Sequence, residues 1–136
     1  MKGDVLRGHL DLLVLQAKQM GAEPAVTVRL YGGTPEKAAH LVEYANIDKG
    51  YNIRYWSIGN EPNIFVGSVR APSYTVEDLN RDWRPIAEAM LAVDPTITLV
   101  GPDITQYAVQ NATSNPIEHL PGSVGGIPLD SAGNDW

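Results

Sequence analysis

The feature that most constrains the fold is a regular alternation of helix-like and strand-like segments. Three segments rich in β-branched and aromatic residues, at 25–31, 52–59 and 96–100, are each preceded by a segment with apolar residues at helical spacing. Glycine and proline mark where each strand-like segment ends. Strands that alternate with helices pair in parallel, because each helix returns the chain to the start of the next strand. The sequence therefore predicts an α/β fold, either an open doubly wound sheet or a (β/α)8 barrel.

Capping residues predict the limits of the first two helices. Asp4 can cap the start of the first helix, and Gly21 ends it. Thr34 can cap the second helix, with Pro35 in its first turn. We expect this helix to continue to the turn at 48–50, where aspartate, lysine and glycine follow one another.

The third helix is predicted from Thr75, with Asp78 as its capping-box partner three residues later. Its apolar residues continue on both sides of Pro85, which removes one helical hydrogen bond. We therefore expect a kink or a restart at Pro85. An aspartate and a proline at 94–95 end the helix.

Composition and charge exclude several classes of function. The 136-residue chain has 10 basic and 16 acidic residues and a net charge of −6, the opposite sign to that of most nucleic-acid-binding domains. It has no cysteine, which excludes disulfide scaffolds, iron–sulfur sites and thiol nucleophiles. His9, His40 and His119 show no metal-ligand spacing, so we predict no metal; we also expect no cofactor, because the chemistry that the resemblance described below implies uses carboxylates alone. No apolar run approaches the roughly 20 residues that span a bilayer, so we expect no membrane partner.

The most informative segment, residues 55–63, has the sequence YWSIGNEPN. It places Asn60 and Glu61 at the carboxyl end of a predicted parallel strand, which is the catalytic face of a (β/α)8 barrel. Pro62 cannot donate a hydrogen bond to a neighbouring strand, so the strand must end there. Gly59 leaves room for another backbone or a ligand to approach closely.

This segment resembles a known family. Residues 56–62 resemble the strand-four signature of the retaining glycoside hydrolases of clan A. The flanking sequence is similar to the third strand, third helix and start of the fifth strand of their arabinofuranosidase, β-xylosidase and glucuronidase-like branches. The resemblance covers roughly residues 4 to 104. It is carried outside the signature by residues 26–28, 32–36, 42–46, 94–95 and 100–103. It implies a partial (β/α)8 barrel with about strands three to five, and an oligosaccharide or polysaccharide substrate.

The resemblance also implies roles for two residues, Glu61 as general acid/base and Asn60 as the ligand of the sugar 2-hydroxyl. Cleavage of a glycosidic bond needs a proton on the leaving oxygen, which a carboxylic acid can donate and later recover from water. A hydrogen bond to the 2-hydroxyl that strengthens in the transition state adds several kcal/mol of stabilisation. The alternative is that Glu61 is an exposed carboxylate at the end of a strand, without a catalytic role.

Retaining hydrolysis also needs a second carboxylate about 5–5.5 Å from the first, acting as nucleophile. In clan A this residue is a glutamate on strand seven. A barrel has about 250 residues, or about 31 for each βα unit, so 136 residues correspond to about half of one. We therefore expect residues 1–136 to be a fragment of a single catalytic domain, inactive without the missing remainder of the barrel. Within it, residues 103–136 are rich in proline and glycine and are expected to form an irregular, loop-rich end.

Three residues on the predicted strands are candidate substrate contacts. Arg29 and Tyr31 share one face of their strand, because alternate residues point the same way. Arg29 can point toward the sugar site or toward the lower rim of the barrel. Trp56 can be a platform for a sugar ring or part of the barrel core, and its depth in the strand favours the core.

Three further candidate substrate contacts lie after strand ends. Phe65 and Tyr74 belong to the loop that follows the catalytic strand, where aromatic rings can stack on sugars or pack on the barrel itself. Asp103 follows the third strand-like segment and is expected at the same rim. We favour a turn role for Asp103 over a nucleophilic one. The remaining acidic residues considered as nucleophiles, which lie in the loop-rich end, are Glu118, Asp130 and Asp135.

Two other interpretations of the sequence stay open. A non-catalytic carbohydrate-binding α/β domain would use Asn60 and Glu61 for sugar contacts alone. An unrelated flavodoxin-like domain would contain the Asn-Glu-Pro sequence by chance, although ligands of such folds also bind at strand ends.

Overall fold

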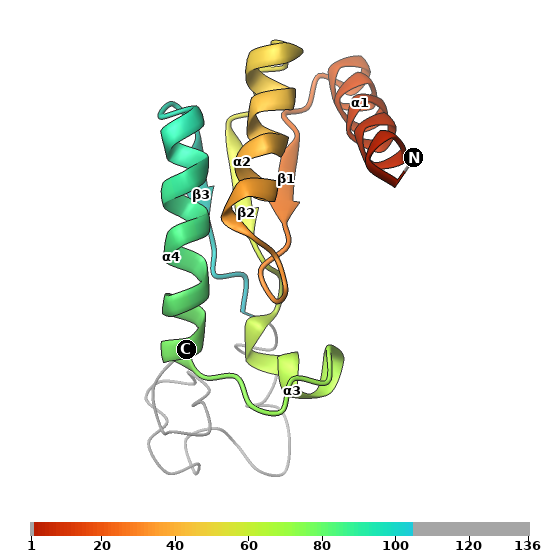
Figure 1. The fold of residues 1–136 in the computed structure, drawn as a ribbon. Helices are drawn as coiled ribbons and strands as arrows, with labels where there is room; N and C mark the ends of the chain where they lie inside the picture. The colour runs from red at the N-terminus through yellow and green to blue at the C-terminus, as the bar shows by residue number, and fades with distance from the viewer. Residues whose placement is uncertain (1, 105–136) are drawn as a thin grey trace.

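The protein is a small parallel sheet covered by helices, as Figure 1 shows for the computed structural model, which describes residues 2–104. The three strands pair in parallel in the order β1-β2-β3. The principal elements, in chain order, are α1 (Lys2–Met20), β1 (Ala25–Val28), α2 (Pro35–Val42), β2 (Tyr55–Ile58), α4 (Val76–Val93) and β3 (Thr98–Val100). The α/β prediction is therefore confirmed at the level of a mixed fold with a parallel sheet.

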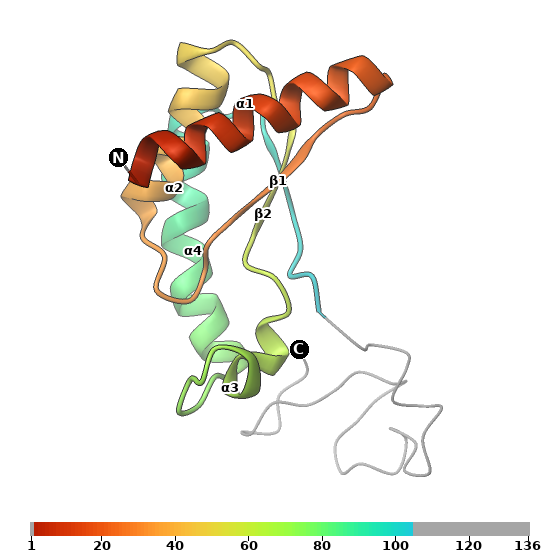
Figure 2. The same ribbon diagram turned by 90° about the vertical axis from the view of Figure 1, so that its right-hand side faces the viewer.

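Two helices cover the same face of the sheet. Helices α2 and α4 pack side by side against it, and the opposite face carries no helix of the described chain (Figures 1 and 2). Helix α1 lies beside β1, on the side away from β2. Both strand–helix–strand connections thus run over one face, while the strands follow one another in sequence order.

The predicted N-terminal caps of α2 and α4 are present, whereas α1 already begins at Lys2, so Asp4 lies inside that helix and the prediction of Asp4 as its cap is wrong. The Thr34 hydroxyl accepts a hydrogen bond from the Lys37 N–H at 3.3 Å, and Pro35 occupies the first turn of α2. The Thr75 and Asp78 side chains each bond to the backbone N–H of the other, which completes a capping box on α4. These bonds satisfy N–H groups that have no partner inside the helix.

Helix α4 continues through Pro85 as one element, so the predicted restart does not occur. Pro85 lies on the exposed side of the helix, where the carbonyl four residues earlier can be hydrated when it loses its helical partner. The other end of α4 agrees with the prediction, because Asp94 is its C-terminal cap.

The chain after α2 differs from the prediction. Residues Glu43–Asp48 form a π-helix, η1, in which the Lys49 N–H donates to the carbonyl of Tyr44. The buried Asn46 side chain accepts from the Ile53 N–H at 2.8 Å and donates to the Ile53 carbonyl at 3.0 Å. It also donates to an Asp94 carboxylate oxygen at 2.7 Å. This single amide joins η1, the approach to β2 and the end of α4.

The core lies between the sheet and the helices. Trp56, Met90 and Val42 are fully buried, and Ile53 is almost so. Buried apolar residues of α1, among them Leu10, extend the same cluster past β1. No helix in residues 2–104 is both long and apolar enough to span a membrane.

Candidate active site at the carboxyl ends of the strands

Backbone hydrogen bonds join the carboxyl ends of all three strands. The Gly59 N–H donates to the Val28 carbonyl at 2.9 Å, and the Glu61 N–H donates to the Asp103 carbonyl at 3.0 Å. Gly59 has a φ of 82°, and a Cβ built there would lie 2.8 Å from the Leu30 Cβ. Only glycine allows the chain to leave β2 this close to the segment after β1.

Glu61 has an unusual backbone conformation. Its φ of 54° and ψ of 52° lie in the left-handed region, which costs a non-glycine residue roughly 1–2 kcal/mol. The conformation turns the chain into the short 3-10 helix η2 (Pro62–Ile64), whose Ile64 N–H donates to the Glu61 carbonyl at 3.1 Å. Strain of this kind accumulates at functional sites, where surrounding bonds maintain it. Asn60 next to it is exposed, and Glu61 is partly exposed.

The face of the sheet opposite the helices carries mainly side chains with a hydroxyl group, together with an alanine and a valine. The strand register places Thr27 and Ser57 side by side, with their hydroxyl oxygens 2.6 Å apart. Sequence analysis did not single out this pair, although both residues are polar positions within largely apolar strands. The residues on this face are Ala25, Thr27, Tyr55, Ser57, Thr98 and Val100.

Arg29 follows β1 directly and is exposed at the carboxyl end of the sheet. Its Nε donates to the Tyr31 carbonyl at 2.8 Å. The turn beside it is tight, because a Cβ on Gly33 would lie 1.9 Å from the Arg29 carbonyl oxygen. The structure therefore places a cation and an aromatic side chain on the loop next to the end of β2.

Three predicted contact residues, Tyr31, Phe65 and Tyr74, form one aromatic cluster. The ring centroids of Phe65 and Tyr74 are 4.9 Å apart, and that of Tyr31 lies 5.8 and 5.9 Å from theirs. Phe65, in the short helix α3 (Phe65–Ser68), and Tyr74 are both buried, whereas Tyr31 is half-buried. The Tyr74 hydroxyl donates to Asp82 at 3.2 Å. Burial, and then the Asp82 charge, raise the pKa of Tyr74. The cluster packs the loop after β2 onto the loop after β1.

Trp56, also predicted as a sugar contact, lies on the helix-facing side of β2. It is 0% exposed, and its indole N–H donates to the Ile53 carbonyl at 2.9 Å. A ring in this position belongs to the core and offers no surface to a ligand on the open face. Trp56 is therefore not part of the site proposed below.

Within residues 2–104, no cluster of three histidine or acidic side chains has an arrangement that could hold a metal ion.

The remaining residues predicted for the site are Asp103 and the acidic residues of the loop-rich end. Asp103 reaches the site through its backbone bond to Glu61. Glu118, His119, Asp130 and Asp135 lie outside the described residues, as does all but the start of the loop-rich end predicted for 103–136.

Comparison with known proteins finds a curated relative that matches most of the chain. α-L-Arabinofuranosidase C of Emericella nidulans is 27% identical over 130 residues, which cover 81% of this chain and 25% of that protein. Among solved structures, a bifunctional glucanase–xylanase protein from a metagenome library is 27% identical, with a TM-score of 0.43. That match covers 52% of this chain and 14% of the other. No family model matches. The chain is therefore similar in sequence to a glycoside hydrolase, of which it spans about a quarter of the length.

Proposed function

We propose that this chain is part of a retaining glycoside hydrolase and that Glu61 is the general acid/base. The observation that carries the proposal is the conformation of Glu61. It is a partly exposed carboxylate in the left-handed region, at the end of the central strand and beside the exposed Asn60. The similarity to an arabinofuranosidase supports the same conclusion.

We further propose that the sheet is part of a (β/α)8 barrel of the clan A type. Parallel strands in sequence order, with the helices on one face, favour a barrel over a doubly wound sheet, in which helices cover both faces. Strands β1, β2 and β3 then correspond to about the third to fifth barrel strands. The open face with Thr27 and Ser57 would line the barrel interior below the substrate.

In this mechanism Glu61 donates a proton to the glycosidic oxygen as the bond to the leaving group breaks. It later accepts a proton from the water that releases the sugar. The Asn60 amide binds the 2-hydroxyl of the same sugar. Arg29 and Tyr31 are proposed to contact the substrate from the neighbouring loop. The nucleophile, a second carboxylate about 5–5.5 Å from Glu61, is proposed to belong to the remainder of the barrel.

Sugar binding by the chain tests the proposal. We expect arabino- or xylo-oligosaccharides to shift the NMR signals of the Asn60 side-chain amide and the Glu61 backbone. Asn60→Ala should weaken this binding about fivefold, since it removes one hydrogen bond worth about 1 kcal/mol. The matched control is Asn80→Ala, because Asn80 is equally an exposed asparagine but lies on α4. Absence of any shift with either class of sugar would overturn the proposal.

Hydrolysis tests the location of the nucleophile separately. The chain alone should not release nitrophenol from 4-nitrophenyl arabinofuranoside or xyloside above the rate of buffer. Turnover by the chain that disappears in Glu61→Ala would confirm a role for Glu61 but would refute the proposal that the nucleophile lies in the missing part.

A further inference from the structure

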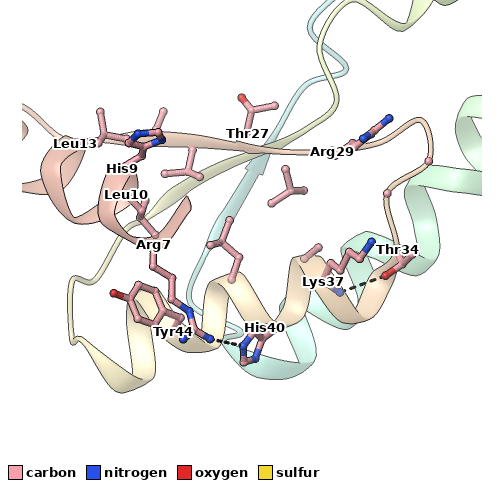
Figure 3. Close-up of a pocket in the computed structure, with 17 residues that line it drawn as sticks. Arg7, His9, Leu10, Leu13, Thr27, Arg29, Thr34, Lys37, His40 and Tyr44 are labelled. Carbon is pink, nitrogen blue, oxygen red and sulfur yellow. Dashed lines mark hydrogen bonds between the residues drawn. The ribbon is translucent and has the colours of Figure 1, made fainter. Parts of the chain in front are cut away.

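The Arg29 side chain lies on the face of the sheet that carries the proposed site. Arg29 follows Thr27 by two residues, and alternate residues of a strand point to the same face. Figure 3 shows the two side chains on the same side of β1, with Lys37 of α2 on the other side. Arg29 is exposed, so its guanidinium is accessible to a ligand on this face.

The strand register brings Arg29 close to the proposed general acid/base. Val28 pairs with Ile58, and the Gly59 N–H donates to the Val28 carbonyl, so Arg29 lies beside Gly59. Adjacent strands are about 4.8 Å apart, and Glu61 follows Gly59 by two residues. An oligosaccharide bound at Glu61 can therefore extend over Arg29.

The guanidinium of Arg29 is held in place through its Nε–H group. This group donates to the Tyr31 carbonyl at 2.8 Å. The guanidinium lies over Gly32, where a Cβ would be 3.5 Å from Nη2 of Arg29. The N–H groups on Nη1 and Nη2 form a planar fork that can bond to both oxygens of a carboxylate. An arginine already held in one orientation loses little conformational freedom when it binds such a group.

No carboxylate of the described chain neutralises this charge. Arg29 forms no ion pair within residues 2–104, whereas Arg81 pairs with both Asp78 and Asp82. The whole chain has a net charge of −6, which repels an anionic ligand at long range. Binding of an acidic sugar therefore requires a local cation, and Arg29 provides one on the face where the substrate is proposed to lie.

We propose that Arg29 binds the carboxylate of a uronic acid unit, so that the site accepts oligosaccharides with an acidic sugar beside the sugar bound by Asn60. A guanidinium and a carboxylate are both planar, carry opposite unit charges and form two parallel hydrogen bonds. A phosphate ester carries up to about two negative charges, and the strands of residues 2–104 offer no second cation on this face. The inference rests on the proposed glycosidase function and adds the class of substrate.

Two forms of one oligosaccharide test the inference with the full 136-residue chain. The probe is a xylo-oligosaccharide with a glucuronic acid branch. Its partner is the same molecule after reduction of the carboxyl group to an alcohol, so the two forms differ only at this group. Titrations are followed through the NMR signals of the Asn60 side-chain amide and the Glu61 backbone. The acidic form should bind about tenfold more tightly, because a charged hydrogen bond contributes more than a neutral one.

Matched variants assign this preference to Arg29. Arg29→Gln removes the charge and should make the two forms bind with equal affinity. Arg29→Lys keeps the charge without the planar fork and should retain only part of the preference. The control is Arg54→Gln, which removes the same charge from an exposed arginine directly before β2, at the opposite end of the sheet. It should leave the ratio of the two affinities unchanged.

Equal binding of the two forms by the unmodified chain would overturn the inference and leave the proposed glycosidase function standing. So would binding of neutral xylo-oligosaccharides without binding of either probe. A preference that persists in Arg29→Gln, or that disappears equally in Arg54→Gln, would show that another group or the overall charge is responsible. Absence of binding by all of these sugars would overturn the proposed function, and the inference with it.

Discussion

Two strained residues meet at the end of the sheet. Glu61 and Asp103 both have positive φ angles, 54° and 28°, and the N–H of the first donates to the carbonyl of the second. Each turn therefore helps to maintain the other. The backbone of residues 59–61 bonds to the segments that end β1 and β3, so the Glu61 side chain starts from a fixed position, as positioned proton transfer requires.

Relief of this strain gives a prediction about stability. Glu61→Gly should have a free energy of unfolding about 1 kcal/mol higher than Glu61→Ala, because glycine tolerates the left-handed region and alanine does not. Both variants lose the carboxylate, so their difference isolates the backbone. Urea unfolding followed by tryptophan fluorescence measures it.

The control for this pair uses a helical glutamate. Glu36 lies in the first turn of α2. There the order should reverse, since glycine is the poorer helix former. Equal stabilities of Glu61→Gly and Glu61→Ala would show that the Glu61 backbone stores no strain.

The sequence predicted some residues of the site and missed others for a physical reason. Asn60 and Glu61 stand out because a polar pair follows an apolar strand and precedes a proline. The contact between Thr27 and Ser57 depends on the register between two strands, which neither strand encodes alone. The side of β2 to which Trp56 points depends on the same register, so its burial emerges only from the fold.

The helices and strands were predicted in the correct order, and the errors lie where tertiary contacts act. The strands are shorter than their β-rich segments, because pairing rather than composition sets their limits. The π-helix at Glu43–Asp48 is another such case. It depends on bonds from Asn46 to Ile53 and Asp94, which is far along the chain. Periodicity within a helix cannot reveal a constraint of that kind.

The capping box of α4 gives a prediction at this scale. Thr75→Ala removes the side-chain acceptor of the Asp78 N–H and should lower the free energy of unfolding by about 1 kcal/mol. Ser73→Ala is the control, since Ser73 is exposed and precedes the cap. Thermal unfolding followed by circular dichroism compares the two. Equal melting temperatures would contradict a stabilising role for the box.

At the scale of the molecule, one carboxylate attaches α1 to the rest of the fold. Asp11 accepts hydrogen bonds from the Tyr51 hydroxyl at 2.7 Å and from the Tyr44 hydroxyl at 3.0 Å. The Tyr51 bond, followed by Tyr44 and the charge of Lys49, lowers the pKa of Asp11 below its ordinary value of 3.8. The bond to Asp11 is also the main reason why the pKa of Tyr51 rises to about 12.

These shifts predict how stability depends on pH. The lowered pKa of Asp11 stabilises the folded protein at pH values above the pKa that this carboxyl has in the unfolded chain. This contribution to the free energy of unfolding should disappear as pH falls below about 4. The raised pKa of Tyr51 stabilises the folded protein below pH 10, where the hydroxyl keeps its proton. This contribution to the free energy of unfolding should disappear as pH rises from 10 to about 12. Urea unfolding across both ranges measures the two slopes.

Two variants assign these slopes to the bond. Asp11→Asn should reduce both slopes, and Tyr51→Phe should reduce the alkaline slope, to which the raised pKa of Tyr74 also contributes. The exposed Asp48 gives the control Asp48→Asn, which changes the net charge equally. Unchanged slopes in Asp11→Asn would contradict the role of this contact.

Because the two faces of the sheet have different surroundings, neighbouring residues of one strand should differ in the mutations that they tolerate. In β2, Trp56 and Ile58 fill the core, while Tyr55 and Ser57 alternate with them and point to the other face, where Ser57 is 5% exposed and bonds to Thr27. Random mutagenesis selected for folding should therefore conserve every second residue of the strand. Selection for a new ligand should change the others. A library at Thr27, Tyr55, Ser57 and Thr98 would thus vary the lining of the proposed site while the packing beneath it remained unchanged.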